Sequence, residues 1–207
     1  MKKWLTVRPG LQWQLLWIPY LIIFFLENNY TVPKYIIHTP LDDLIPFCEW
    51  FAFPYCSWFL LLAGVTALLW WYDTQAYYKL VKMMFSGMFF CLFIYIILPN
   101  GLELRPPVVE RENIATWIMN FLWQVDDPAN VCPSIHCQTS AAMALAFSGS
   151  RLGRGKPARQ ILSWCWAGLI CASTVFTKQH SILDVVLGVA LIVPWYFILY
   201  RKEKTAL

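Results

Sequence analysis

Two histidines and one aspartate are the residues of this chain whose types and spacing best suit a chemical reaction. His180 and Asp184 are four residues apart, so on a helix they would share a face, and the carboxylate could hold one imidazole nitrogen. Histidine can attack phosphorus to form a phosphohistidine, and a second histidine can protonate the leaving oxygen. The residues therefore suggest His180 as nucleophile, Asp184 as its orienting group and His136 as general acid. A structural His–Asp pair that only fixes a turn is the alternative.

The second histidine follows a signal for the start of a helix. Pro133 favours an extended backbone and Ser134 is a preferred N-cap, so a helix is predicted to begin there. The free N–H groups of a helix N-terminus bind anions, and His136 in the first turn would lie beside such an anion. Alternatively, Ser134 only caps the helix and His136 only anchors it at lipid headgroups.

The composition indicates that lipid surrounds the elements that position these groups. Hydrophobic residues make up 59% of the 207 residues and charged residues 14%, whereas about a quarter of the residues in a soluble domain are charged. The net charge of +4 is too small to indicate a nucleic-acid partner. Seven cysteines without a CxxC pair predict neither a zinc module nor a disulfide framework. No cofactor is expected.

Apolar runs that approach the roughly 20 residues needed to cross a bilayer recur along the whole chain. There are six, at residues 11–26, 54–72, 80–98, 134–148, 161–177 and 182–200. They predict one all-α domain over residues 1–207, a polytopic membrane protein with six transmembrane helices. The polar cluster at residues 177–181 marks a turn, because residues 161–200 as one helix would be roughly 60 Å long.

The basic residues predict the orientation of these spans. With the N-terminus inside, twelve of the sixteen Lys and Arg residues lie in inner segments, as the positive-inside rule requires. We therefore expect a multi-pass protein of the cell membrane with both termini cytoplasmic. The polar groups at residues 105–106, 132–136 and 173–184 would all open at the outer face.

An outer amphipathic helix is expected between the third and fourth spans. Within residues 110–124 the apolar side chains recur at helical spacing, namely at Ile114, Trp117, Ile118, Phe121 and Leu122.

The polar groups together resemble the three-part signature of the type 2 phosphatidic acid phosphatase superfamily, which includes vanadium haloperoxidases. That signature reads Lys-x6-Arg-Pro, Pro-Ser-Gly-His and Ser-Arg-x5-His-x3-Asp. The matching residues, within 98–184, are Arg105-Pro106, Pro133-Ser134-Ile135-His136 and Ser173-x6-His180-x3-Asp184. The resemblance implies a six-helix core, an outward-facing site and phosphohistidine chemistry without a metal. It also implies the roles suggested above for His136, His180 and Asp184.

Departures from the signature reduce the positive charge expected at the site. Leu98 stands where the family has Lys, Ile135 replaces Gly, and Thr174 replaces Arg. Arg105, Ser134 and Lys178 then remain as candidates to bind the substrate phosphate, although Lys178 could instead extend to lipid headgroups. The loss of two cations favours a less charged phosphate group.

The first hypothesis is an integral-membrane lipid phosphatase that hydrolyses a lipid phosphate or pyrophosphate at the outer leaflet, with membrane lipids around it. The alternative is a phosphodiester headgroup transferase, similar to the relatives that make sphingomyelin or inositol phosphorylceramide, using the same two histidines and aspartate. A third hypothesis is a lipid-binding or transport protein without turnover. The sequence carries no signal for an oligomeric state.

Overall fold

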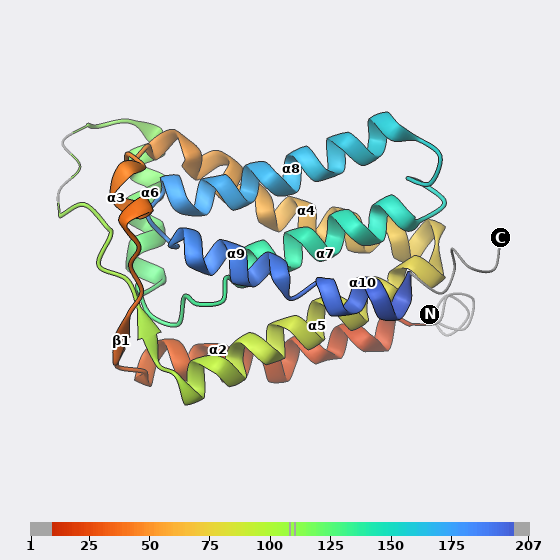
Figure 1. The fold of residues 1–207 in the computed structure, drawn as a ribbon, viewed down its shortest axis with the longest axis horizontal. Helices are drawn as coiled ribbons and strands as arrows, with labels where there is room; N and C mark the ends of the chain where they lie inside the picture. Colours follow the sequence, from red (N-terminus) through yellow and green to blue (C-terminus); the bar gives the residue numbers. More distant parts are fainter. Residues whose placement is uncertain (1–9, 108, 110, 201–207) are drawn as a thin grey trace.

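The structure is a computed structural model and describes residues 10–107, 109 and 111–200. Figure 1 shows the long helices lying side by side, with α3, α6 and β1 gathered at one end, and with α10 and the connection from α7 to α8 at the other. The fold is mostly helical, as the sequence predicted.

A helix or a pair of helical segments occupies each of the six apolar runs. These elements are η1 (Leu11–Leu16) with α2 (Trp17–Tyr30), α4 (Ala52–Tyr72), α5 (Thr74–Ile97), α7 (Ile135–Gly149), α8 (Pro157–Phe176), and α9 (Ile182–Ala190) with α10 (Val193–Leu199). Three helical segments among the described residues are long and apolar enough to cross a membrane: Glu49–Tyr72, Thr74–Ile97 and Ile182–Leu199. They indicate that the protein associates with membranes.

Helix α7 lies in the centre of the bundle and packs most closely against α8 and α5. Its small side chains, including Ala142 and Ala144, are fully buried. The Gln138 side chain of α7 packs against the backbone of α5 at Gly87, where an added Cβ would overlap that side chain. Close packing of this kind fixes the first turn of α7, which carries His136.

The last apolar run is interrupted in its middle. Helix α9 ends at Ala190 and α10 begins at Val193, with Pro194 in the first turn of α10. Proline lacks a backbone N–H and cannot continue a helix without a break, which accounts for the interruption.

Short elements cover the end of the bundle at which α9 begins. They are α3 (Pro40–Leu44), η2 (Glu49–Phe51), α6 (Ile114–Val125), and the parallel pair of β1 (Tyr35–Ile36) with β2 (Asn100–Gly101). Helix α6 overlaps residues 110–124, where the apolar side chains recur at helical spacing, and starts after Asn113, whose side chain accepts a hydrogen bond from the Thr116 N–H at 3.0 Å. Asn113 also donates to the buried carboxylate of Glu49 at 3.1 Å, which joins α6 to the start of α4.

Candidate active site

His136, His180 and Asp184 meet at the covered end of the bundle. Nδ1 of His180 lies 3.3 Å from Oδ2 of Asp184, and Nε2 of His180 lies 3.4 Å from Nδ1 of His136. His180 and Asp184 are buried, with 6% and 0% of their surfaces exposed. The structure thus brings together the three residues that the spacing singled out for catalysis.

The His180–Asp184 pair forms for a reason other than the shared helix face that the spacing suggested. His180 precedes α9, and Ser181 is the N-cap of that helix. Oδ2 of Asp184 accepts the backbone N–H of Ser181 at 2.9 Å while it contacts His180, so one carboxylate starts the helix and orients the imidazole. The two residues do not share a helical face, because His180 lies before the N-cap Ser181, in the turn that the polar cluster at residues 177–181 predicted.

His136 is held by the start of α7 and by aromatic side chains of α4. Ser134 caps α7, and its side-chain oxygen accepts the Cys137 N–H at 3.3 Å. The ring of His136 lies against the rings of Trp58 and Tyr55, with centroids 4.6 Å and 4.8 Å away. The predicted helix start at Ser134 is confirmed, and its hydroxyl is used as the cap.

The starts of α7 and α9 are locked together. The backbone N–H of Ser134 donates to the carbonyl of Asp184 at 3.0 Å. Gly188 allows this approach, because a Cβ there would lie 2.5 Å from the carbonyl oxygen of Ser134. The separation of the two histidines is therefore set by backbone contacts between their helices.

Lys178 makes a contact on the far side of the turn. Its ammonium group donates to the backbone carbonyl of Asp42 at 2.7 Å. The Asp42 carboxylate accepts hydrogen bonds from the Ser181 hydroxyl at 2.7 Å and from the Ile182 N–H at 2.8 Å. Burial alone would raise the pKa of Asp42, but these hydrogen bonds outweigh it and lower the pKa. Asp42, which the sequence analysis did not identify, ties α3 to the turn that carries His180.

Arg105 reaches the site through a neighbouring side chain. Its Nη2 donates to Oε1 of Gln179 at 2.6 Å and to the backbone carbonyl of Asp126 at 2.8 Å. Burial lowers the pKa of the Arg105 guanidinium and raises that of the Asp126 carboxyl, against the opposing effect of Arg105. No sequence motif marked Gln179, although it lies in the polar cluster that located the turn.

A small cavity of about 40 Å³ adjoins the two histidines. Its other lining residues are Phe24, Tyr95, Asp126, Asp127, Ala129, Asn130, Val131, Ile135 and Gln179. Asn130 and Gln179 contribute carboxamides, and among the described residues no set of three His, Cys, Asp or Glu side chains is arranged to hold a metal ion.

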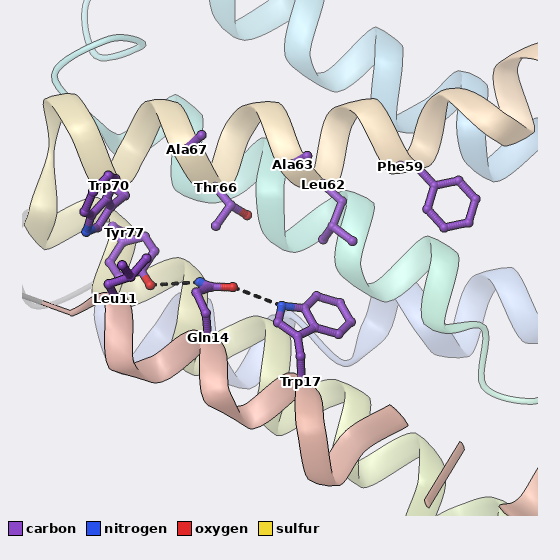
Figure 2. A pocket seen from close by; sticks show the side chains of 10 residues that line it. All are labelled: Leu11, Gln14, Trp17, Phe59, Leu62, Ala63, Thr66, Ala67, Trp70 and Tyr77. Carbon is purple, nitrogen blue, oxygen red and sulfur yellow. Dashed lines mark hydrogen bonds between the residues drawn. The ribbon is translucent and has the colours of Figure 1, made fainter. Parts of the chain in front are cut away.

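A second and larger cavity of about 650 Å³ lies between α4 and the segment formed by η1 and α2. Figure 2 shows Phe59 at one end of it and Trp70 at the other, with Gln14 bridging Tyr77 and Trp17. The Gln14 amide donates to the Tyr77 hydroxyl at 2.8 Å and accepts the Trp17 indole N–H at 3.0 Å. The rest of the lining is mainly apolar.

Fold and site together define a helical, membrane-associated protein with a histidine–histidine–aspartate centre. A model of the PAP2 superfamily matches residues 76–206, which is more than half of the chain and includes both histidines and Asp184. The chain therefore belongs to the type 2 phosphatidic acid phosphatase superfamily, whose members are phosphatases or related enzymes. No curated protein and no solved structure was found to match it.

Proposed function

We propose that the protein is an integral-membrane lipid phosphatase that hydrolyses a lipid phosphate or pyrophosphate through a phosphohistidine. The observation that carries the proposal is the position of His180 between Asp184 at its Nδ1 and His136 at its Nε2. A carboxylate at Nδ1 keeps the proton there and leaves the lone pair on Nε2 free to attack.

The first step forms a bond between Nε2 of His180 and phosphorus and breaks the bond from phosphorus to the ester oxygen. His136, protonated, gives its proton to that oxygen, and the lipid alcohol leaves. In the second step water attacks phosphorus, His136 takes the proton of the water, and the bond to His180 breaks. Inorganic phosphate is released, and both histidines return to their starting states.

The charge that develops on the phosphoryl oxygens needs nearby donors. The first-turn N–H groups of α7, which starts at Ser134, form such a site beside His136. Arg105 donates to Oε1 of Gln179 at 2.6 Å and so orients a further side chain at the same cavity. The contact of 3.4 Å between the imidazole nitrogens leaves no room for phosphorus, so substrate binding replaces that contact.

The membrane arrangement that we propose has six spans, with the site near the outer leaflet. The basic residues between α7 and α8, among them Arg151, Arg154 and Lys156, belong to the end of the bundle opposite α3 and α6 (Figure 1). Positive charge at that end supports a cytoplasmic position for it. Lys2, Lys3, Arg8, Arg201, Lys202 and Lys204, which also entered the orientation argument, lie outside the described residues.

Helix α6 would then lie in the outer interface. Its Ile114, Trp117, Phe121 and Val125 are more than half exposed and recur at helical spacing. An exposed apolar stripe of this kind suits the boundary between headgroups and acyl chains.

The large cavity supports a binding place for the apolar tail of the substrate. Phe24 of α2 lines the small cavity at the histidines and Trp17 of α2 lines the large one, two turns away or roughly 10 Å along the helix. On α4, Trp58 contacts His136 while Phe59 lines the large cavity. A lipid between α2 and α4 would place its phosphate at His180 and its tail in the large cavity.

The test offers purified protein a panel of lipid phosphates, pyrophosphates and phosphodiesters, and follows phosphate and lipid products together. We expect phosphate release in equal amount to the dephosphorylated lipid, and a loss of several orders of magnitude in rate for His180→Ala. The matched control is His38→Ala, since His38 is an exposed histidine paired with Asp43. Equal rates in the wild type and His180→Ala would contradict the proposal and favour a lipid-binding or transport protein.

A headgroup transferase is the second candidate, and a specific observation favours it. Asp126 and Asp127 line the cavity at the histidines, and carboxylates suit the hydroxyl or cationic group of a diester headgroup better than a second phosphate charge. In this case an alcohol resolves the phosphohistidine in place of water. Headgroup exchange without release of phosphate would identify this activity.

A further inference from the structure

The side chain of Gln179 is buried with half of its hydrogen-bonding capacity unused. Only 4% of Gln179 is exposed, and its Oε1 accepts a hydrogen bond from Arg105 at 2.6 Å. Its Nε2 is buried and has no partner. Buried polar groups are nearly always hydrogen-bonded, so a free amide donor beside the catalytic His180 points to a ligand.

The contact with Arg105 fixes which end of the carboxamide faces the histidines. A guanidinium has donors only, so the atom next to Nη2 of Arg105 must be the amide oxygen. The NH2 group of Gln179 is therefore the end left for the cavity, which Gln179 lines together with His136 and His180. Arg105 itself does not line the cavity. It affects the cavity only through its hydrogen bond to Gln179.

Asn130 supplies a second carboxamide to the same cavity. Its Nδ2 and Oδ1 are both buried without a partner. The residue has a φ of 57°, a left-handed backbone that Asn tolerates better than most residues. Its backbone N–H donates to the carbonyl of Asn100 at 2.6 Å, which holds it at the cavity wall.

The charges around the cavity are unusual for a phosphate site. Among the described residues, the cavity lining contains Asp126 and Asp127 and no Lys or Arg. Lys178, the nearest cation along the chain, is bound to the backbone carbonyl of Asp42. Carboxylates repel a phosphate with two negative charges more strongly than a phosphate with one, and the neutral amide donors carry no charge to offset this difference.

We propose that the Gln179 carboxamide, positioned by Arg105, binds a non-bridging oxygen of the substrate together with Asn130, and that the site selects a phosphate group carrying a single negative charge. The substrate is then a phosphodiester or the hydrogen form of a phosphomonoester. The inference rests on the proposed function and adds the charge of the group that the site accepts. Gln179 is a substrate-binding residue here, and Arg105 is a positioning residue.

The first experiment measures the charge preference directly. The purified enzyme is given a lipid phosphomonoester and the methyl diester of the same lipid, and kcat/KM is compared from pH 6 to pH 8. The ionisable side chains that face the cavity are His136, His180, Asp184, Asp126 and Asp127, with Arg105 behind Gln179. A change in their charge affects kcat/KM for both substrates and therefore cancels in the ratio of the two values. Because the monoester has a second pKa of about 6, we expect its rate to fall more than tenfold relative to the diester. A ratio that stays constant or rises with pH would overturn the inference.

The second experiment changes the amide. Gln179→Glu keeps the shape, removes the donor and adds a negative charge, and we expect kcat/KM to fall at least about 100-fold, since about 100-fold is the usual cost of losing one such donor. Gln179→Lys adds a cation and should remove most of the pH dependence of the ratio. The matched control is Gln124→Glu, the same chemical change at an exposed position of α6, which should leave kcat/KM within twofold. Thermal unfolding in detergent checks that each variant is folded.

A double-mutant cycle tests whether Arg105 works through Gln179. We expect Gln179→Ala with Arg105→Ala to lose no more than about threefold beyond Gln179→Ala alone, because without the amide there is nothing left for Arg105 to position. If the loss in the double variant equals the product of the two single losses, Arg105 binds the phosphate itself. That result would overturn its role as a positioning residue. Turnover that does not respond to Gln179→Glu would overturn the inference and leave the proposed function standing. No turnover of any substrate by the wild type would overturn both.

Discussion

The two histidines of the site are held by different kinds of contact. Around His180 the contacts are polar, since Asp184 accepts from both the imidazole and the Ser181 N–H. Around His136 they are aromatic, with Tyr55 and Trp58 against the ring. The one imidazole is fixed in direction and tautomer by hydrogen bonds, whereas the other is fixed in place by packing.

This difference suits two different tasks. A nucleophile needs its lone pair aimed at phosphorus, and a carboxylate at the opposite nitrogen supplies that aim. A general acid must give up and regain a proton, and aromatic walls hold the ring without a charge that would retain the proton. The comparison predicts that polar substitutions near His180 cost more activity than packing substitutions near His136.

The largest effect is expected for Asp184→Asn. Asn can present its NH2 group to Nδ1 of His180 and favour the wrong tautomer, and we expect kcat to fall about 10³-fold to 10⁴-fold, as in other histidine–aspartate centres. Because Oδ2 of Asp184 also accepts the Ser181 N–H, an Asn that turns its NH2 group to His180 leaves that N–H without its acceptor, and we expect the free energy of unfolding to fall by about 0.5–2 kcal/mol. Steady-state kinetics and thermal unfolding in detergent measure the two effects.

Asp73→Asn is the matched control for this variant. Asp73 caps α5 by accepting the Ala76 N–H at 3.1 Å, so the same chemical change is made at another helix start. Helix α5 starts where α4 ends, at the opposite end of that helix from Tyr55 and Trp58. Activity of Asp184→Asn within tenfold of the wild type would contradict the claim that hydrogen bonds orient His180 for the reaction.

A smaller effect is expected for Asp42→Ala, which acts on the turn that carries His180. The Ser181 hydroxyl and the Ile182 N–H would lose their acceptor. We expect the free energy of unfolding to fall by about 2–4 kcal/mol and kcat to fall about tenfold to 100-fold. Asp43→Ala, at the exposed neighbouring residue, is the control and should change neither quantity appreciably.

The Asp42 contribution should depend on pH in a defined direction. The pKa of Asp42 is lowered below its ordinary value of 3.8, so the ionised carboxylate stabilises the fold above that value. The stabilisation is lost as the pH falls through the lower pKa of the folded protein. The difference in stability between the wild type and Asp42→Ala should therefore be constant near neutral pH and shrink below about pH 4. A difference that grows on acidification would contradict the assignment.

The histidine site and the helices could be predicted from the sequence because their signals are local. Hydrophobic runs locate the helices and the Pro133-Ser134 pair locates the start of α7. The four-residue spacing pairs Asp184 with His180, although the contact forms through the capping box at the start of α9 and not on a shared helical face. The contacts of Asp42 and of Arg105 could not be predicted in this way, since they join residues 139 and 74 positions apart in the chain. Such contacts depend on how the outer connections fold over the bundle, and the spacing of hydrophobic residues does not predict the path of these connections.

The smallest effect is expected for Trp58→Phe, which tests the packing side of the comparison. Phe keeps an aromatic wall against His136 but loses the hydrogen bond of 2.8 Å from the indole to Thr139. Thr139 still donates to the Ile135 carbonyl at 2.7 Å, so its hydroxyl keeps a hydrogen-bond partner. We therefore expect activity to fall only about threefold to tenfold. The fall in kcat/KM, which reports the first step, should be confined to substrates with alkyl alcohol leaving groups, which need a proton, and should vanish for a nitrophenyl phosphate ester, which does not. The comparison uses kcat/KM because kcat includes the second step, in which His136 takes the proton of water for either substrate. Trp50→Phe, at an exposed tryptophan, is the control, and an equal loss on both substrate types would mean that Trp58 supports the fold and not the acid.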